Sequence, residues 1–160
     1  MKISTIVAAC AFASAASAAP APAPAAALEK RAYYTDIGEI WGCVWAVGPI
    51  DCKRAKTAAS KATKAAEQLF PTSLHNGKGD AFRHCYWNAL MVHYIGAGQA
   101  KEVADAHENK GKQPKKEKEM DLYNNSKGRT IGKNTKGKGD SAAKTACKNA
   151  ANNGTLRRLN

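Results

Sequence analysis

The chain is predicted to be all-α, a small disulfide-stabilised helical bundle of about four to five helices. Three observations predict this class. Apolar residues recur every three to four positions in several segments, and no segment alternates with the period of a strand. Four cysteines remain once Met1–Arg31 is set aside, an even number typical of a secreted disulfide-bonded domain. Subtracting 31 from 160 leaves 129, enough for one domain with a modest core.

The segment Met1–Arg31 is predicted to be removed from the working protein. Met1–Ala18 has the form of a secretory signal peptide, with a positive start, an apolar stretch too short to span a bilayer, and small residues at its end. Residues 19–31 form an extended proline-rich pro-segment that ends at the dibasic pair Lys30-Arg31. This segment resembles the pro-segments of fungal secreted proteins. We therefore expect a secreted, extracellular domain of residues 32–160 without a transmembrane segment.

The mature chain begins with an aromatic segment and continues into its clearest helix. Residues 32–50 carry Trp41 and Trp45 at helical spacing, but glycines and a proline there predict a short or broken element. Residues 53–70 place alanines on one stripe and lysines on the other, which predicts an amphipathic helix that ends before Pro71. The small alanines allow a neighbouring helix to approach closely.

The rest of the chain predicts four further helices. In order, they cover residues 80–95, 99–108, 116–127 and 141–152. Asp80 and Asp140 are placed to cap the first and the last of these, and Gly128 is placed to end the third. A lysine-rich loop, residues 110–118, and a basic glycine-rich loop, residues 133–139, are expected between helices.

The mature cysteines allow three pairings. We favour Cys43–Cys52, because a Gly-Pro turn lies between these two residues. Cys85–Cys147 then ties the central helix to the C-terminal one. No Cys-x-x-Cys pair occurs, which argues against a zinc site built from cysteines.

The charge of the chain predicts the chemistry of its partner. The sequence holds 25 Lys and Arg against 13 Asp and Glu, a formal net charge of +12, and removal of Met1–Arg31 leaves 22 against 12, or +10. This excess is more than solubility requires. It predicts an anionic surface as partner: a bacterial envelope polymer, an acidic lipid or glycan, or nucleic acid. We expect the protein to be a monomer.

Residues able to do chemistry are concentrated between His75 and Arg129. Asp80, His84 and Asn88 are spaced i, i+4 and i+8, so they share one face of a helix. The candidate catalytic residues are His84, Asp80, Asp105, His107, Glu108 and Asp121. The candidate binding residues are Arg83, Asn88, Asn124, Asn125 and Arg129.

This set of residue types permits several kinds of chemistry. A histidine beside a carboxylate is a common general base. Histidine with Asp and Glu can also hold a divalent cation, although no ligand set is assigned here. Asn and Arg side chains could hold an oxyanion or a phosphate. The same residues also fit a structural polar core, with Asp80 as a helix cap and Arg83 as a bridge to Asp80 or Asp121.

Three ordered motifs resemble a family of small helical domains found mainly in bacterial proteins, many of them secreted. They are Gly79–Asn88, Ala104–Glu108 and Met120–Asn125 with Gly128–Gly132, which match D-A-x-R-H-x-x-W-N, D-A-H-E and M-D-L-x-N-N-x-x-G-x-x-I. The resemblance covers roughly residues 76–132 and implies a helical fold with a shared polar site. The family has no established activity, so no reaction is implied. Cys85 stands where the family often has Ala.

A weaker likeness concerns the secreted phospholipases A2 of fungi and bacteria. Residues 83–88 are similar to their R-H-D-x-x-Y-x-N helix. The Asp of that motif helps to hold calcium, and Cys85 takes its place here. Neither the calcium site nor the lipase activity is therefore carried over.

Three functions remain open from the sequence. The first is a secreted effector or antimicrobial protein that hydrolyses an anionic envelope polymer or lipid, with His84 as general base, and the density of polar motifs favours it. The second is a non-catalytic effector that binds anionic surfaces through residues 110–118 and 133–138. The third is a nucleic-acid binder or nuclease. Asn124 and Asn153 are formal glycosylation sites, and burial of Asn124 would exclude a glycan there.

Overall fold

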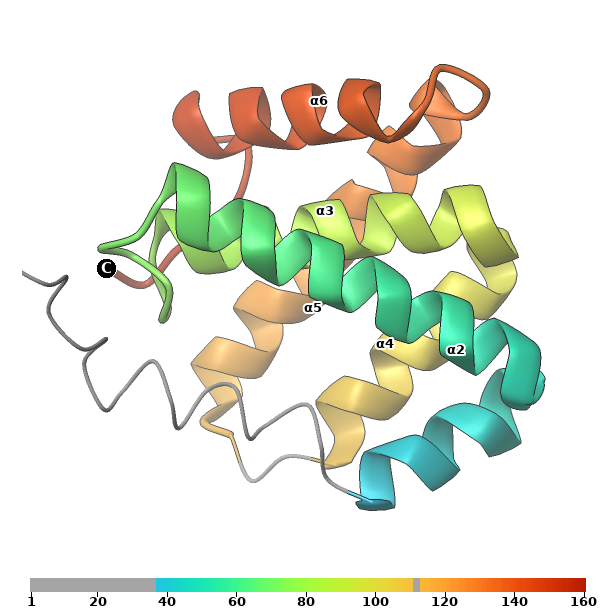
Figure 1. The fold of residues 1–160 in the computed structure, drawn as a ribbon. Helices are drawn as coiled ribbons and strands as arrows, with labels where there is room; N and C mark the ends of the chain where they lie inside the picture. Colours follow the sequence, from blue (N-terminus) through green and yellow to red (C-terminus); the bar gives the residue numbers. More distant parts are fainter. Residues whose placement is uncertain (1–36, 111–112) are drawn as a thin grey trace, which may run out of the picture.

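A computed structural model describes residues 37–110 and 113–160, and their regular structure is entirely helical, as predicted. The helices are α2 (Ile37–Leu69), α3 (Lys78–Ile95), α4 (Ala97–Lys110), α5 (Lys115–Thr135) and α6 (Asp140–Asn152) (Figure 1). The expected signal peptide and pro-segment lie outside the described residues. Within the described ranges, every helix is too short or too polar to cross a membrane.

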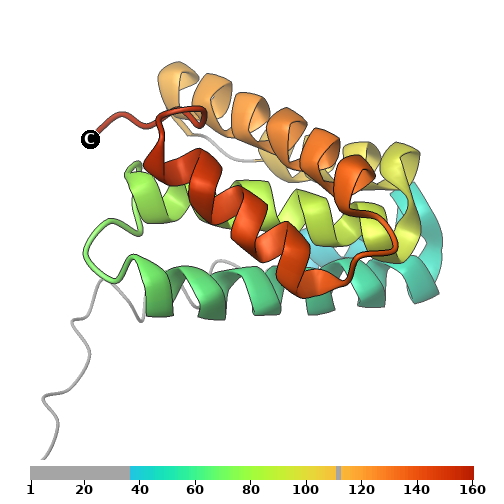
Figure 2. The ribbon, with the colours of Figure 1, turned by 90° about the horizontal axis from the view of Figure 1, so that it is seen from above.

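Helix α3 is the central element of the bundle. It contacts each of the other four helices, with α2, α5 and α6 arranged around it (Figures 1 and 2). Every side chain from Asp80 to Val92 is buried except that of Arg83, which is partly buried. A helix buried on all sides has no face that solvent can satisfy. Its polar residues must therefore find partners on neighbouring helices.

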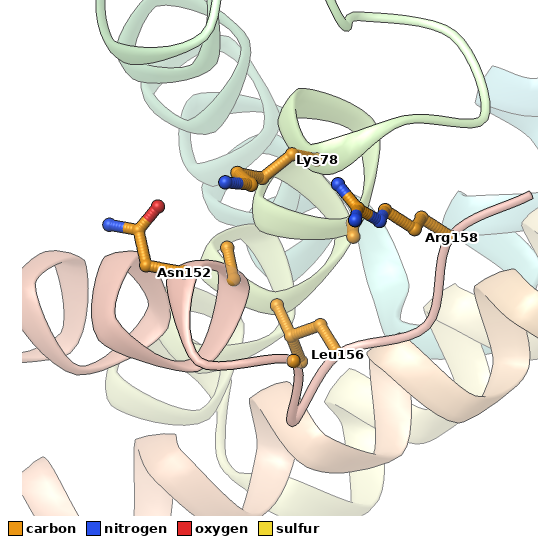
Figure 3. A pocket seen from close by; sticks show the side chains of 7 residues that line it. Lys78, Asn152, Leu156 and Arg158 are labelled. Atoms are coloured by element: carbon orange, nitrogen blue, oxygen red, sulfur yellow. The ribbon is translucent and has the colours of Figure 1, made fainter. Parts of the chain in front are cut away.

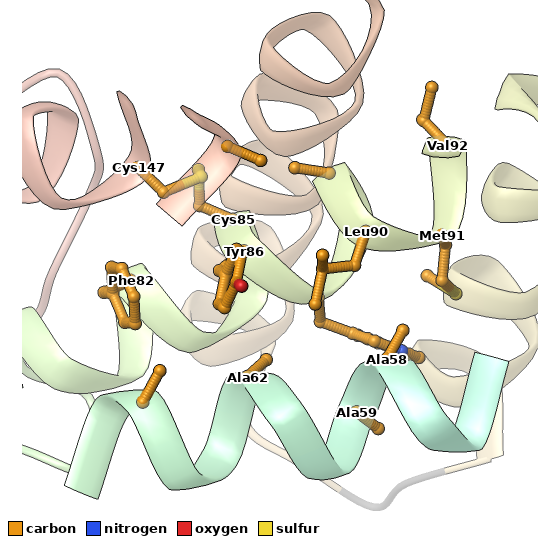
Figure 4. Packing of buried hydrophobic residues seen from close by; sticks show 14 of the residues in the cluster. Ala58, Ala59, Ala62, Phe82, Cys85, Tyr86, Leu90, Met91, Val92 and Cys147 are labelled. Carbon is orange, nitrogen blue, oxygen red and sulfur yellow. A yellow bond between two sulfur atoms is a disulfide. The ribbon is translucent and has the colours of Figure 1, made fainter. Parts of the chain in front are cut away.

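Helix α2 is kinked and then packs closely on α3. Gly48 has φ 79° and ψ 167°, outside helical geometry, and Pro49 follows it, which confirms the predicted break. After the kink the alanine stripe faces α3, with Ala58 and Ala62 completely buried (Figure 4). The indole Nε1 of Trp87 donates a hydrogen bond to the Ala55 carbonyl at 3.2 Å. The small side chains of α2 thus let large side chains of α3 reach its backbone.

Both predicted disulfides are present. Cys43–Cys52 bridges the kink of α2, with 5.5 Å between the Cα atoms. Cys85–Cys147 joins α3 to α6, with a Cα separation of 5.9 Å, beside the aromatic core (Figure 4). The two rings of Phe82 and Tyr86 pack 5.6 Å apart in this core.

Helix α5 is longer than predicted, because Gly128 does not end it. The helix continues to Thr135, so the basic glycine-rich loop is shorter than residues 133–139. A Cβ atom on Gly128 would lie 2.3 Å from the Cys85 carbonyl oxygen, and one on Gly132 would lie 2.8 Å from the Ala89 carbonyl oxygen. These glycines are therefore the points where α5 presses against α3.

Two further sequence expectations were wrong in detail. The residues that cap α3 and α6 are Gly77 and Gly139, rather than Asp80 and Asp140, and neither described cap has a side-chain cap hydrogen bond. Asp80 lies in the first turn of α3, where its Oδ2 accepts a hydrogen bond from the Asn76 backbone N–H at 2.7 Å. The expected loop at residues 110–118 is also partly helical, since α4 ends at 110 and α5 begins at 115.

Candidate functional site

Three helices converge on His84 and surround it with polar side chains. We call this set the His84 cluster; it comprises Asp80, Arg83, His84 and Asn88 from α3, Glu108 from α4, and Asp121, Asn125 and Arg129 from α5. His84 and Glu108 are each only 1% exposed. Eight of the eleven residues singled out from the sequence thus meet in one place. The predicted i, i+4, i+8 face of α3 supplies its central part.

A chain of hydrogen bonds fixes the orientation of the His84 ring. The Asn125 amide nitrogen donates to Glu108 Oε1 at 2.9 Å, and this leaves the Asn125 Oδ1 facing His84. His84 Nδ1 lies 3.1 Å from that oxygen, so Nδ1 carries the proton and donates it. Asn88 donates to the same Oδ1 at 2.7 Å. His84 Nε2 is consequently the bare ring nitrogen.

The bare nitrogen faces one cation and two carboxyl groups. Arg83 Nη2 lies 2.6 Å from His84 Nε2 and also 2.6 Å from Asp80 Oδ1, so the guanidinium donates to both. Asp121 Oδ1 is 3.3 Å from Nε2, and Asp80 Oδ1 is 3.8 Å away. Arg129 donates to Asn88 Oδ1 at 3.0 Å and so supports the cluster from the α5 side.

Burial and neighbouring charges shift the proton affinities of this cluster in different directions. Burial, followed by the charge of Arg83, lowers the pKa of His84 well below its ordinary value. Burial, followed by repulsion from Glu108 and Asp80, raises the pKa of Asp121 to about 8. Burial is the largest effect on Asp80 and acts to raise its pKa, but the Arg83 charge, the His84 ring and the hydrogen bonds from Asn76 and Arg83 together outweigh it and leave that pKa well below the usual range. The neutral imidazole therefore lies beside one ionised and one protonated carboxyl group at neutral pH.

One carboxylate oxygen of the cluster lacks a hydrogen-bond donor. Asp121 Oδ1 is buried, and no described residue donates to it. Its second oxygen, Oδ2, lies 3.5 Å from the Gln113 amide nitrogen, which also donates to Glu108 Oε2 at 3.0 Å. His84, Glu108 and Asp121 offer donor atoms that all lie within 4.8 Å of one another, a spacing that could hold a metal ion. Gln113 was missed from the sequence, since it lies between two helices, where periodicity carries no signal.

The structure places three candidate residues outside the cluster. Asp105 forms an ion pair with Lys101 one turn earlier on α4. The ring of His107 lies 6.4 Å from that of His84, and 5.4 Å from that of Trp87 in an edge-on contact. Asn124 is fully buried and holds the C-terminal tail through two hydrogen bonds of 2.9 Å with the Arg157 backbone. The burial of Asn124 excludes a glycan at that residue in the folded protein.

A second polar cluster, the Asp140 cluster, lies at the start of α6. Asp140 Oδ2 accepts hydrogen bonds from Lys61 Nζ at 2.8 Å and from the Tyr94 hydroxyl. His93 Nδ1 is 3.8 Å from Asp140 Oδ1. These contacts join α2, α3 and α6, and Asp140 itself is only partly buried.

Positive charge gathers in the last quarter of the chain. Between residues 122 and 160 the cations are Lys127, Arg129, Lys133, Lys136, Lys138, Lys144, Lys148, Arg157 and Arg158, against the single carboxylate side chain of Asp140. We call this set the cationic C-terminal region. It spans the second half of α5, the neighbouring α6 and the C-terminal tail (Figure 2). All of its cations except Lys127 and Arg129 are exposed.

A small pocket opens beside this region. Lys78, Asn152, Leu156 and Arg158 line it, and its volume is about 70 Å³ (Figure 3). Two of these side chains are cationic, and no described carboxylate lines it. A space of this size holds a few water molecules.

One known family matches the part of the chain that forms the helical core. The model of the Domain of unknown function (DUF6973) family matches residues 43–155. The chain belongs to this family. The DUF6973 match covers both disulfides, all of α3 to α6 and the whole His84 cluster. No activity is assigned to this family of domains, and the three motifs and the bacterial, secreted likeness stay predictions. No solved structure matches the chain.

Proposed function

We propose that the protein is a secreted cationic effector that binds an anionic polymer of another organism's cell envelope through its cationic C-terminal region. The observation that carries this proposal is the charge imbalance of residues 122–160, with nine cations against one Asp side chain. That single carboxylate is already paired with Lys61 at 2.8 Å. The exposed lysines and arginines therefore retain a strong field toward solvent.

The surroundings of these charges favour a polymer over a membrane or nucleic-acid bases. Among the described residues of this region, Leu159 is the one large apolar side chain that is clearly exposed, so little surface is available to enter a bilayer. Arg157 lies over the Tyr123 ring at 4.0 Å and Lys127 at 5.3 Å, so two cations would compete with a stacking base for this ring. Repeated phosphate or carboxylate groups suit such a surface best.

The binding experiment compares two variants with equal charge change at different places. Lys144→Glu/Lys148→Glu alters α6, and Lys53→Glu/Lys56→Glu alters exposed lysines of α2. At about 1 kcal/mol for each cation near an anionic surface, the α6 variant should bind a teichoic-acid-type polyphosphate at least about 30-fold more weakly. The α2 variant should lose much less. Added salt should weaken binding of the unaltered protein steeply.

The comparison of the two variants decides the proposal. Equal losses in both variants would mean that net charge alone drives binding, and would contradict a specific surface. Stronger binding to anionic vesicles or to DNA than to the polymer would contradict the choice of ligand. The polymer, the vesicles and the DNA should be tested at the same salt concentration.

A hydrolytic activity at the His84 cluster is the second candidate. Two neighbouring groups favour this activity. His84 is neutral and can accept a proton, whereas Asp121, whose pKa is raised to about 8, can donate one. Hydrolases often use such a pair as base and acid. Arg83 and Arg129 could hold a negatively charged substrate group. The depth of burial means that a substrate would need the cluster to open. Turnover of the polymer that disappears in His84→Ala, with binding retained, would establish this activity.

A further inference from the structure

The His84 cluster has the arrangement of a metal-binding histidine with its supporting shell. Metal ligands of this type commonly donate the second ring N–H to an acceptor, which holds the other nitrogen toward the ion. His84 Nδ1 donates to Asn125, and Glu108 holds the Asn125 amide in place. His84 Nε2 is left without a proton, and its lone pair now accepts a hydrogen bond from Arg83, with Asp121 Oδ1 3.3 Å away.

Asp121 supplies an independent observation that a cation belongs here. Its Oδ1 is buried and accepts no hydrogen bond from any described residue, so this oxygen is available as a ligand atom. The oxygen lies 3.3 Å from His84 Nε2. Two ligands that each bind a tetrahedral ion at about 2.1 Å lie roughly 3.4 Å apart. The observed separation therefore fits one ion bound to both atoms.

The carboxyl groups of the cluster outnumber its guanidinium groups, three to two, and these oxygens can serve as ligands for a cation. Three carboxyl groups, those of Asp80, Glu108 and Asp121, face a single guanidinium, that of Arg83, while Arg129 contacts the Asn88 amide instead. One imidazole with carboxylates suits Zn²⁺, whereas Ca²⁺ and Mg²⁺ prefer oxygen ligands alone.

We propose that His84, Glu108 and Asp121 form a binding site for a divalent transition-metal cation of the Zn²⁺ type, for which Arg83 is the competing cation. The Arg83 guanidinium now lies 2.6 Å from His84 Nε2, where the ion would bind. Its side chain is 19% exposed, against 2% for His84, so it lies at the rim and can turn toward solvent. Glu108 Oε2 and Asp121 Oδ2 both contact the Gln113 amide nitrogen, which keeps the two carboxyl groups close together.

This site is independent of the proposed surface binding, and it alters the second candidate function. An ion on Nε2 takes the lone pair that a general base needs. In the zinc-bound protein, His84 would act as a ligand, and a metal-bound water would be the nucleophile of any hydrolysis.

The test is a titration of the disulfide-intact protein, stripped of metal with EDTA, with Zn²⁺ alone at pH 7. Calorimetry is expected to show one ion per chain, with a rise in melting temperature, and Ca²⁺ or Mg²⁺ at the same concentration should give neither. Asp121→Asn should weaken Zn²⁺ binding on the order of 100-fold. Asp105→Asn, which alters an aspartate of α4 paired with Lys101, is the matched control and should bind as the unaltered protein does. Arg83→Gln should bind Zn²⁺ about 10-fold more tightly, since its competitor is gone.

Several outcomes would overturn the proposal. One is a folded, unaltered protein that binds no Zn²⁺, and another is an Asp121→Asn variant that binds it equally well, since surface histidines would then be the ligands. Equal or weaker binding by Arg83→Gln would refute the displacement of the guanidinium. If Asp121→Asn does not fold, X-ray absorption of the zinc-loaded unaltered protein decides. One imidazole with oxygen ligands supports the site, and two or more imidazoles refute it.

Discussion

Asp121 and Asp140 each lie beside a histidine and a cation, yet the pKa of Asp121 is raised and that of Asp140 is lowered. Asp140 accepts hydrogen bonds from Lys61 and Tyr94, and these outweigh the effect of burial and lower its pKa. Asp121 has a buried Oδ1 to which no described residue donates, and its pKa is raised to about 8. Whether a carboxyl group is ionised therefore depends on the hydrogen-bond donors that reach it and on its access to water, more than on the types of residue nearby.

The presence or absence of hydrogen-bond donors also distinguishes the two clusters, one as a structural contact and the other as a candidate site. The Asp140 cluster ties three helices together with its donors already in place, which is sufficient to explain it. The His84 cluster contains a preorganised ring and an unsatisfied oxygen. Such an arrangement lowers stability unless a ligand or a reaction makes use of it.

The largest expected effect comes from removing the disulfide that holds α6, and with it Asp140, against α3. Cys85 and Cys147 are separated by 62 residues, so replacing both with Ala should lower the free energy of unfolding by about 4 kcal/mol. Replacing Cys43 and Cys52, separated by 9 residues, should cost about 2.5 kcal/mol. Urea denaturation measures both. A larger loss from the Cys43–Cys52 pair would contradict this ranking of the two disulfides by loop length.

The next effect concerns the close contact of α5 with α3 beneath the His84 cluster. Gly128→Ala would place a Cβ 2.3 Å from the Cys85 carbonyl oxygen, so the helices must separate, at a cost of about 3 kcal/mol. Gly98→Ala in α4 is the control, because nothing lies within 4 Å of its Cβ. That variant should be neutral or stabilised by up to about 1 kcal/mol. Similar values for the two variants would refute the close packing.

The stability of Asp121→Asn, measured in EDTA at two pH values, tests whether burial penalises the Asp121 carboxylate. The unfolded chain loses the Asp121 proton near pH 4, whereas the folded chain keeps it up to about pH 8. The stability of the unaltered protein therefore falls as the pH rises through this range. The variant should be about 2 kcal/mol more stable at pH 8 and nearly equal at pH 4. A variant that is less stable at pH 8 would show that the carboxylate has a donor.

Asp140→Asn should give the smallest effect, with the opposite sign. The lowered pKa of Asp140 means that its contribution is present at neutral pH and is lost as the pH falls through and below about 4. Because the cluster is partly exposed, the variant should lose no more than about 1 kcal/mol at pH 7. The two proteins should become equally stable near pH 3. A difference that persists in acid would point to lost packing instead of lost charge.

Periodicity predicted the helices and the polar face of α3, and the Gly-Pro turn between Cys43 and Cys52 favoured, among three possible pairings, the one that the structure contains. The sequence could not distinguish a glycine that ends a helix from one that allows close packing, and Gly128 was misassigned for that reason. Two adjacent residues also have different partners: Asn125 contacts His84, whereas Asn124 binds the backbone of the C-terminal tail. Side chains one position apart point about 100° away from each other on a helix, so only the tertiary arrangement decides their partners.

The protonation state of the His84 ring is the central feature of the cluster, and the 15N chemical shifts of its two nitrogens report it directly. In metal-free protein at pH 7 we expect a neutral imidazole with the proton on Nδ1, donated to Asn125, and this state should persist well below pH 6.5. An Nε2–H tautomer, or an imidazolium formed near pH 6.5, would contradict the arrangement. Nε2 would then have no lone pair to offer to Arg83 or to an ion.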